Sequence, residues 1–210
     1  MKLFLASEAK NPGNFSKMEE FVGGFEGKTL AYIPTAANGE SKYGVWEKES
    51  SSWVLIKSLG VKVISVVLEE QTTEEVEENL SRADIIWVAG GACGYLMYWM
   101  RRHNLQKTLP KILDSEKIYI GSSAGSMIAS KSLSVTEWYV GEQEKGAGII
   151  PGLSLVDFEI YPHFREDDLE EIKNLREENK TGMPLYLLKD GEVITVDGEK
   201  IDFFGEKREV

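Results

Sequence analysis

Short runs of apolar residues alternate along the chain with stretches in which apolar side chains recur every three or four positions. The runs predict β-strands at 3–6, 29–34, 62–68, 84–89, 117–121, 155–161, 185–188 and 193–196. The periodic stretches predict amphipathic helices at 14–23, 41–59, 73–82, 95–102, 105–114, 124–130 and 165–179. This alternation is typical of an α/β fold with a mostly parallel sheet and helices on both faces. The tight-turn pair Asp190-Gly191 separates the last two runs, so we expect an antiparallel C-terminal hairpin there.

The length and composition favour a single domain. A chain of 210 residues with 42% hydrophobic content can bury one sizeable core, so we expect one domain over residues 1–210. Polar residues follow the first apolar run at Ser7, and no run of 18 apolar residues occurs, so we expect neither a secretion signal nor a membrane span. The single cysteine, Cys93, excludes an internal disulfide and fits a reducing compartment. We therefore expect a soluble, cytoplasmic protein.

The charge of the chain is strongly acidic. Its 24 basic and 35 acidic residues give a net charge of −11, and acidic runs occupy positions 69–70 and 74–78. Such a surface repels phosphate backbones, so nucleic acid is excluded as an expected partner. An anionic substrate would need a local cation, and Arg165 is the candidate. The alternative for Arg165 is a solvated position at a helix start, and Arg101 and Arg102 remain open as well.

The most informative motif is Gly121-Ser122-Ser123-Ala124-Gly125, which lies where a predicted strand runs directly into a predicted helix. G-x-S-x-G at a strand-to-helix turn is a nucleophile elbow, with Ser123 at its apex. Small flanking residues allow the backbone to double back while the hydroxyl points outward. The motif predicts a serine hydrolase.

A serine nucleophile needs a general base, and the sequence offers two histidines. His103 follows two arginines at the end of a predicted helix, where a solvated cation is favoured. His163 ends the strand at 155–161 and follows Pro162, so we take it as the base. Lys131 lies about 12 Å from Ser123 along a helix axis, which is too far for a serine–lysine pair.

The N–H groups of Ala124 and Gly91 are the candidates for an oxyanion hole. Ala124 follows the nucleophile, and the Gly90-Gly91 pair ends the strand expected beside the elbow strand. Cys93 lies near this turn but outside the elbow, so we interpret it as a packed residue.

Four segments, in order, carry a resemblance to a known family. They are Ile85–Gly91 with its glycine pair, the elbow, Tyr161-Pro162-His163-Phe164, and Leu188–Val196. Together they resemble the peptidase E family of serine peptidases, the S51 aspartyl dipeptidases. The resemblance implies a fold like the class I glutamine amidotransferases, with serine in the elbow where those enzymes have cysteine.

The resemblance also implies roles for further residues and a substrate class. It assigns the carboxylate that orients the histidine to Asp190; Glu137, a short loop beyond the elbow helix, is the alternative. It implies short peptides, such as dipeptides with an N-terminal aspartate, as substrates, and no metal or organic cofactor. Ala92 stands where the family commonly has a polar, substrate-contacting residue, which weakens an expectation of strict aspartyl specificity.

Two other functions remain open. A cyanophycinase-like enzyme would cleave β-aspartyl-arginine links with the same elbow and fold. A non-catalytic binding protein would keep the fold alone.

A homodimer is a further open question, because several aromatic residues could form a partner surface, although aromatics at helical spacing are more often core. They are Trp46, Trp53, Tyr98, Trp99 and Trp138.

Overall fold

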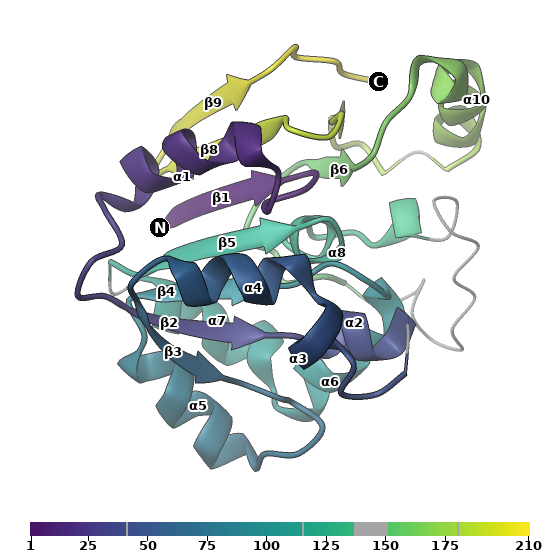
Figure 1. Cartoon of the computed structure of the whole chain (residues 1–210). Coiled ribbons are helices and arrows are strands. Elements are labelled where there is room, and N and C mark those ends of the chain that lie inside the picture. The colour runs from purple at the N-terminus through teal and green to yellow at the C-terminus, as the bar shows by residue number, and fades with distance from the viewer. Residues whose placement is uncertain (41, 115, 137–150, 180) are drawn as a thin grey trace.

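The computed structural model describes residues 1–40, 42–114, 116–136, 151–179 and 181–210 (Figure 1). The strands are β1 (Lys2–Ala6), β2 (Thr29–Ile33), β3 (Lys62–Ser65), β4 (Ile85–Val88), β5 (Ile118–Ser122), β6 (Glu159–Tyr161), β7 (Leu185–Leu187), β8 (Val193–Asp197) and β9 (Lys200–Phe204). The helices are α1 (Phe15–Val22), α2 (Thr35–Glu40), α3 (Trp46–Glu49), α4 (Ser51–Ser58), α5 (Thr73–Arg82), α6 (Cys93–Arg102), α7 (Leu105–Leu113), α8 (Ala124–Met127) and α10 (Leu169–Glu178). Two 3-10 turns, η1 (Pro12–Asn14) and η2 (Glu166–Asp168), precede α1 and α10.

Seven strands form the central sheet, in the order β3-β2-β4-β5-β1-β8-β9. The first five are parallel, whereas β8 pairs antiparallel with β1, and β9 pairs antiparallel with β8. Figure 1 shows β1 between β5 and β8, so the N-terminal strand lies inside the sheet. The α/β class, the mostly parallel sheet and the antiparallel C-terminal strands are confirmed.

Both faces of the sheet are covered, because alternate strand residues enter two separate cores. On β1, Leu3 and Leu5 pack in a core with α5, α6 and α7, and Phe4 and Ala6 pack in a core with α1, Trp46 and α4. Successive residues of a strand point to opposite faces of the sheet. Because both faces are covered by apolar cores, the buried strands appear in the sequence as continuous apolar runs.

Local signals in the sequence set several helix ends. The side chain of Thr72 accepts from the Glu75 N–H while the Glu75 carboxylate accepts from the Thr72 N–H, a capping box that starts α5. Ser50 caps α4 by accepting from the Trp53 N–H, so the single helix predicted over 41–59 is in fact two helices, α3 and α4. Within the described ranges, no helix has both the length and the apolar character needed to cross a membrane.

The antiparallel C-terminal hairpin is formed by β8 and β9, and not by the strands on either side of Asp190-Gly191 as predicted. β7 pairs in parallel with β6 in a separate two-stranded sheet, and β8 turns back into β9, which the sequence did not predict. The Asp190-Gly191 segment therefore crosses from one sheet to the other. This crossing brings Asp190 beside the end of β6 and the carboxyl ends of β1 and β5.

Candidate active site

Ser123 stands at the turn between β5 and α8 in a strained backbone conformation, with φ 48° and ψ −109°. The turn is held from two sides. The Ser123 N–H donates to the Ala6 carbonyl at 3.0 Å, and Gly125 approaches β4 so closely that a Cβ there would lie 2.4 Å from the Val88 oxygen. The glycine is therefore required by packing, and the turn has the form expected of a nucleophile elbow.

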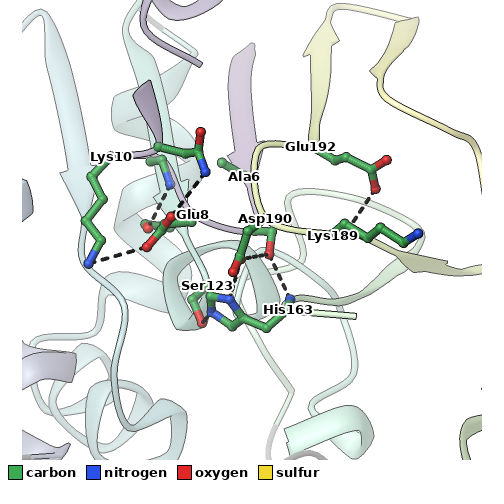
Figure 2. Close-up of polar contacts among 12 residues, drawn as sticks. Ala6, Glu8, Lys10, Ser123, His163, Lys189, Asp190 and Glu192 are labelled. Atoms are coloured by element: carbon green, nitrogen blue, oxygen red, sulfur yellow. Dashed lines mark hydrogen bonds and ion pairs between the residues drawn. The ribbon is translucent and has the colours of Figure 1, made fainter. Parts of the chain in front are cut away.

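His163 follows β6 and links Ser123 to Asp190 (Figure 2). Its Nε2 lies 3.0 Å from Ser123 Oγ, and its Nδ1 lies 2.5 Å from Asp190 Oδ1. An ionised carboxylate only accepts hydrogen bonds, so Nδ1 carries the proton and Nε2 is left to accept from the serine hydroxyl. The side chains of His163 and Asp190 are 34% and 52% exposed, so the pair opens to solvent.

Neighbouring contacts fix the Asp190 loop. The Glu192 carboxylate accepts from the Lys189 N–H at 2.8 Å and from the Arg208 guanidinium at 2.7 Å. Figure 2 shows the Glu192–Lys189 contact directly beside Asp190. The turn that carries the carboxylate is thus tied to the C-terminal segment, although Asp190 itself is half exposed.

The N–H groups of Gly91 and Ala124 are the predicted oxyanion hole, and they lie at the turns after β4 and β5. Ala124 is the first residue of α8, where a helix leaves its N–H without an intrahelical partner. Gly91 has φ 133°, and a Cβ there would lie 2.2 Å from the Ala36 oxygen. Within the described ranges, neither N–H donates to another backbone group.

Ser123 and His163 line a cavity of about 470 Å³. Gly90, Gly91 and Cys93 contribute to its lining from the turn after β4, and residues 45–46 and 49–52 contribute from the α3–α4 region. Glu8 and Lys10 line it from the segment after β1, with Lys10 Nζ 3.5 Å from Glu8 Oε1. Lys10 is the only lysine or arginine lining the cavity in the part of the chain that the structure describes.

The structure does not bring Arg165 into this cavity. Its guanidinium is 80% exposed and donates two hydrogen bonds of 3.2 Å to Asp168, which raise the pKa of the guanidinium. Arg165 thus occupies the solvated alternative, because the chain turns outward directly after His163. Ala92 is also absent from the lining: its N–H donates to the Ala36 oxygen, and its side chain packs beside Gly39.

The remaining candidates lie apart from the triad or outside the description. His103 is 5% exposed, so the expectation of a solvated histidine is wrong. Its ring bonds to the Leu68 carbonyl at 2.7 Å and to the Thr73 hydroxyl at 3.2 Å, which gives it a structural role. Cys93 is 2% exposed with its Sγ 3.6 Å from Met127 Sδ, as expected of a packed thiol. Glu137 and Trp138 lie outside the described residues.

With this geometry established, comparison with known proteins identifies the family. The sequence profile of Peptidase family S51 matches residues 3–204. The chain belongs to peptidase family S51. It is therefore a peptidase, a hydrolase whose substrates are peptides.

A relative from Listeria monocytogenes, described as an uncharacterized peptidase, is 27% identical over 202 residues, which cover 95% of this chain and 96% of that protein. Peptidase E of Pasteurella multocida is 25% identical, covering 90% of this chain and 80% of its own length.

Two solved structures of peptidases agree with the fold. A Listeria monocytogenes protein named after peptidase E aligns with a TM-score of 0.79 and 25% identity, covering 97% of both chains. A peptidase from an acI-B1 Actinobacterium aligns with a TM-score of 0.75 at 17% identity, covering 98% of this chain and 87% of the other. The second likeness shows the shared fold.

The sequence analysis missed Ser7, Glu8 and Lys10. All three follow β1, a strand predicted correctly, and ligands in parallel sheets lie beyond the carboxyl ends of strands. The signal was therefore present. It was overlooked because nothing in the sequence shows that β1 pairs with the elbow strand β5.

Proposed function

We propose that this S51 peptidase is a serine-type enzyme that hydrolyses short peptides through Ser123, His163 and Asp190. The observation that carries the proposal is the continuous path of hydrogen bonds from Ser123 Oγ through the His163 ring to Asp190. This arrangement provides a nucleophile, a base in the required tautomer and a carboxylate that orients it.

The proposed reaction has two acyl-transfer steps. Ser123 Oγ attacks the peptide carbonyl carbon and gives its proton to His163 Nε2, while the carbonyl oxygen becomes an oxyanion between the N–H groups of Gly91 and Ala124. The C–N bond then breaks as the imidazolium returns the proton to the leaving amine. Water, deprotonated by His163, attacks the acyl-serine ester and releases the acid. Asp190 stays ionised throughout and stabilises the imidazolium.

The cavity supports a short substrate. A volume of about 470 Å³ is in the range of small-molecule sites, which suits a peptide of a few residues better than a folded protein. Lys10 and Glu8 offer one charge of each sign near Ser123, matching the free carboxylate and free amine of a dipeptide. In a dipeptide with an N-terminal aspartate, the side-chain carboxylate would compete with the C-terminal carboxylate for Lys10.

A second substrate class is favoured by a different feature of the same cavity. Three glutamates, Glu8, Glu40 and Glu49, line it beside the single Lys10. Carboxylates of this kind would attract a guanidinium, as in the β-aspartyl-arginine link that a cyanophycinase-like enzyme cleaves. A panel of Asp-X dipeptides and isoaspartyl-arginine peptides distinguishes the two substrate classes.

A fluorophosphonate probe tests the serine mechanism itself. We expect one label per chain, located on Ser123 by peptide mass spectrometry, absent in Ser123→Ala and slowed at least about 100-fold in His163→Ala. His103→Gln is the matched control, because it changes the other histidine, which contacts Leu68 and Thr73 instead of the triad. A folded wild-type protein that takes no label would favour the non-catalytic binding protein.

A further inference from the structure

The first residue after β1, Ser7, contacts two members of the triad with one hydroxyl group. Its Oγ donates to Asp190 Oδ1 at 3.0 Å and accepts from the backbone N–H of His163 at 2.7 Å. A serine hydroxyl has one proton to donate and two lone pairs, so this arrangement uses its donor and one acceptor on the triad. We propose that Ser7 is a positioning residue that sets the geometry of the His163–Asp190 pair; this inference rests on the serine mechanism proposed above.

The hydroxyl acts on the same carboxylate oxygen that meets the histidine ring. Asp190 Oδ1 receives both the Ser7 hydroxyl and His163 Nδ1. The Asp190 side chain is 52% exposed, so on its own it could turn toward water, whereas Ser7 is fully buried and has a fixed place. A buried donor therefore holds a half-exposed acceptor in line with the ring.

The same hydroxyl also stabilises the backbone of His163. This residue has φ 54°, a left-handed conformation that is unfavourable for a non-glycine residue. In this conformation its N–H donates to the Ser7 hydroxyl. Because the Ser7 hydroxyl accepts this hydrogen bond, it favours the backbone conformation in which the imidazole points at Ser123.

The position of Ser7 explains why it can serve both residues. Its own N–H donates to the Glu192 carbonyl at 3.2 Å, which ties the end of β1 to the loop that carries Asp190. The carbonyl of the preceding Ala6 accepts from the N–H of Ser123 at 3.0 Å and from the Ser126 hydroxyl at 2.8 Å. The Ala6-Ser7 pair thus contacts all three segments that form the triad.

The experiment measures fluorophosphonate labelling and peptide hydrolysis in Ser7→Ala and Ser7→Thr. We expect Ser7→Ala to lower the labelling rate and kcat by about 10- to 100-fold with KM changed less than about threefold, because both hydrogen bonds of the hydroxyl are made to the triad. Ser7→Thr, which restores a hydroxyl, should recover most of the rate. The matched control is Ser130→Ala: Ser130 is 2% exposed, and its hydroxyl accepts from the Ser132 N–H away from the triad.

A double-mutant cycle separates positioning from a general loss of structure. If Ser7 acts through Asp190, then Ser7→Ala should slow the Asp190→Ala variant by less than about threefold, because the carboxylate that it orients is already gone. Equal slowing in both backgrounds would overturn the role through Asp190 and leave only the contact with the His163 N–H. Labelling at the wild-type rate in folded Ser7→Ala would also overturn the assignment. The same holds for folded Ser7→Cys, which keeps the side-chain size. Loss of the folded state in both variants would overturn it too, since Ser7 would then serve folding.

The two proposals fail in different ways. Absence of labelling in the wild-type chain contradicts the serine mechanism and leaves nothing for Ser7 to position. Strong labelling of Ser123 that is insensitive to Ser7 contradicts the positioning role alone.

Discussion

At the scale of single residues, backbone strain coincides with the chemistry. Of the five non-glycine residues with positive φ in the described ranges, two are Ser123 and His163, at 48° and 54°. Such conformations persist only where surrounding contacts hold them, and both backbones are held by the end of β1: Ser123 by the Ala6 carbonyl, His163 by the Ser7 hydroxyl. One short segment therefore stabilises both halves of the proposed nucleophile–base pair.

Lys10 provides the first prediction at this scale. We expect Lys10→Met to raise KM about tenfold for dipeptides with a free C-terminal carboxylate or an N-terminal aspartate, because the charge-assisted hydrogen bond to the carboxylate is lost. Arg165→Met is the matched control and should leave KM unchanged, since Arg165 pairs with Asp168 outside the cavity. Steady-state kinetics with matched acid and amide peptides measures the effect. A larger change in Arg165→Met than in Lys10→Met would contradict the assignment of the cation.

The sequence predicted Ser123 as nucleophile and His163 as base because the signals are local: an elbow motif for the serine, and the end of a strand for the histidine. Asp190 came from a resemblance, and Ser7 and Lys10 were not found at all. Their positions depend on which strands are neighbours, and contacts such as Ser7–Asp190 join residues 183 positions apart. Strand order is set by the packing of the whole sheet, which no local pattern encodes.

At the scale of elements, apolar runs predicted the buried strands well and failed where tertiary context decides. β9 was missed because its residues are only partly buried at the sheet edge, so Lys200 and Asp202 interrupt the apolar pattern. The tight-turn signal at Asp190-Gly191 was real, since Gly191 has φ 87°, but the strands on either side enter different sheets. A turn signal constrains the local path of the chain and says little about which strand is paired next.

The element that carries His163 depends on a buried ion pair. Glu159 on β6 is 1% exposed and bonds to Arg176 of α10 at 2.6 Å, with the hydroxyls of Ser134 and Thr181 at 2.8 and 2.7 Å. We expect Arg176→Met to lower the free energy of unfolding by about 3–5 kcal/mol, because it leaves the Glu159 carboxylate buried without its cation. Urea denaturation measures this.

Two further variants check that interpretation. Lys173→Met removes an exposed i,i+3 pair with Glu170 on the same helix and should change stability by no more than about 0.5 kcal/mol. Adding Glu159→Gln to Arg176→Met should recover part of the loss, because the uncompensated charge is removed. If Arg176→Met is no worse than Lys173→Met, the pair does not anchor β6.

At the scale of the whole molecule, the five parallel strands end at one edge, and the site lies where β1 and β5 are neighbours. Residues 6 and 122 are paired in register, so Ser7 and Ser123 leave the sheet side by side. Asp190 reaches them because β8 runs antiparallel to β1 and its preceding loop lies at that same edge. Sheet topology thus brings together the proposed triad from three segments that are far apart in the sequence.

The two tyrosines buried in this sheet predict how the whole fold responds to alkali. Tyr119 on β5 is fully buried with its hydroxyl 2.6 Å from the Gly125 carbonyl, and Tyr32 lies on β2; burial raises the pKa of both phenols above the ordinary 10.0. The unfolded chain therefore loses these protons first, so their contribution to stability is complete below pH 10 and declines as pH rises through 10 toward the folded values. Each buried phenol should lower the free energy of unfolding by about 1.4 kcal/mol per pH unit in that range.

Tyr119→Phe should be less stable at pH 8, because the Gly125 carbonyl loses its donor, yet its free energy of unfolding should decline less steeply between pH 10 and 11 in urea titrations. Tyr98→Phe, which changes a phenol that is 47% exposed, should keep the wild-type slope. Because charge repulsion at high pH is common to all three chains, identical slopes for Tyr119→Phe and the wild type would show that Tyr119 does not couple ionisation to unfolding.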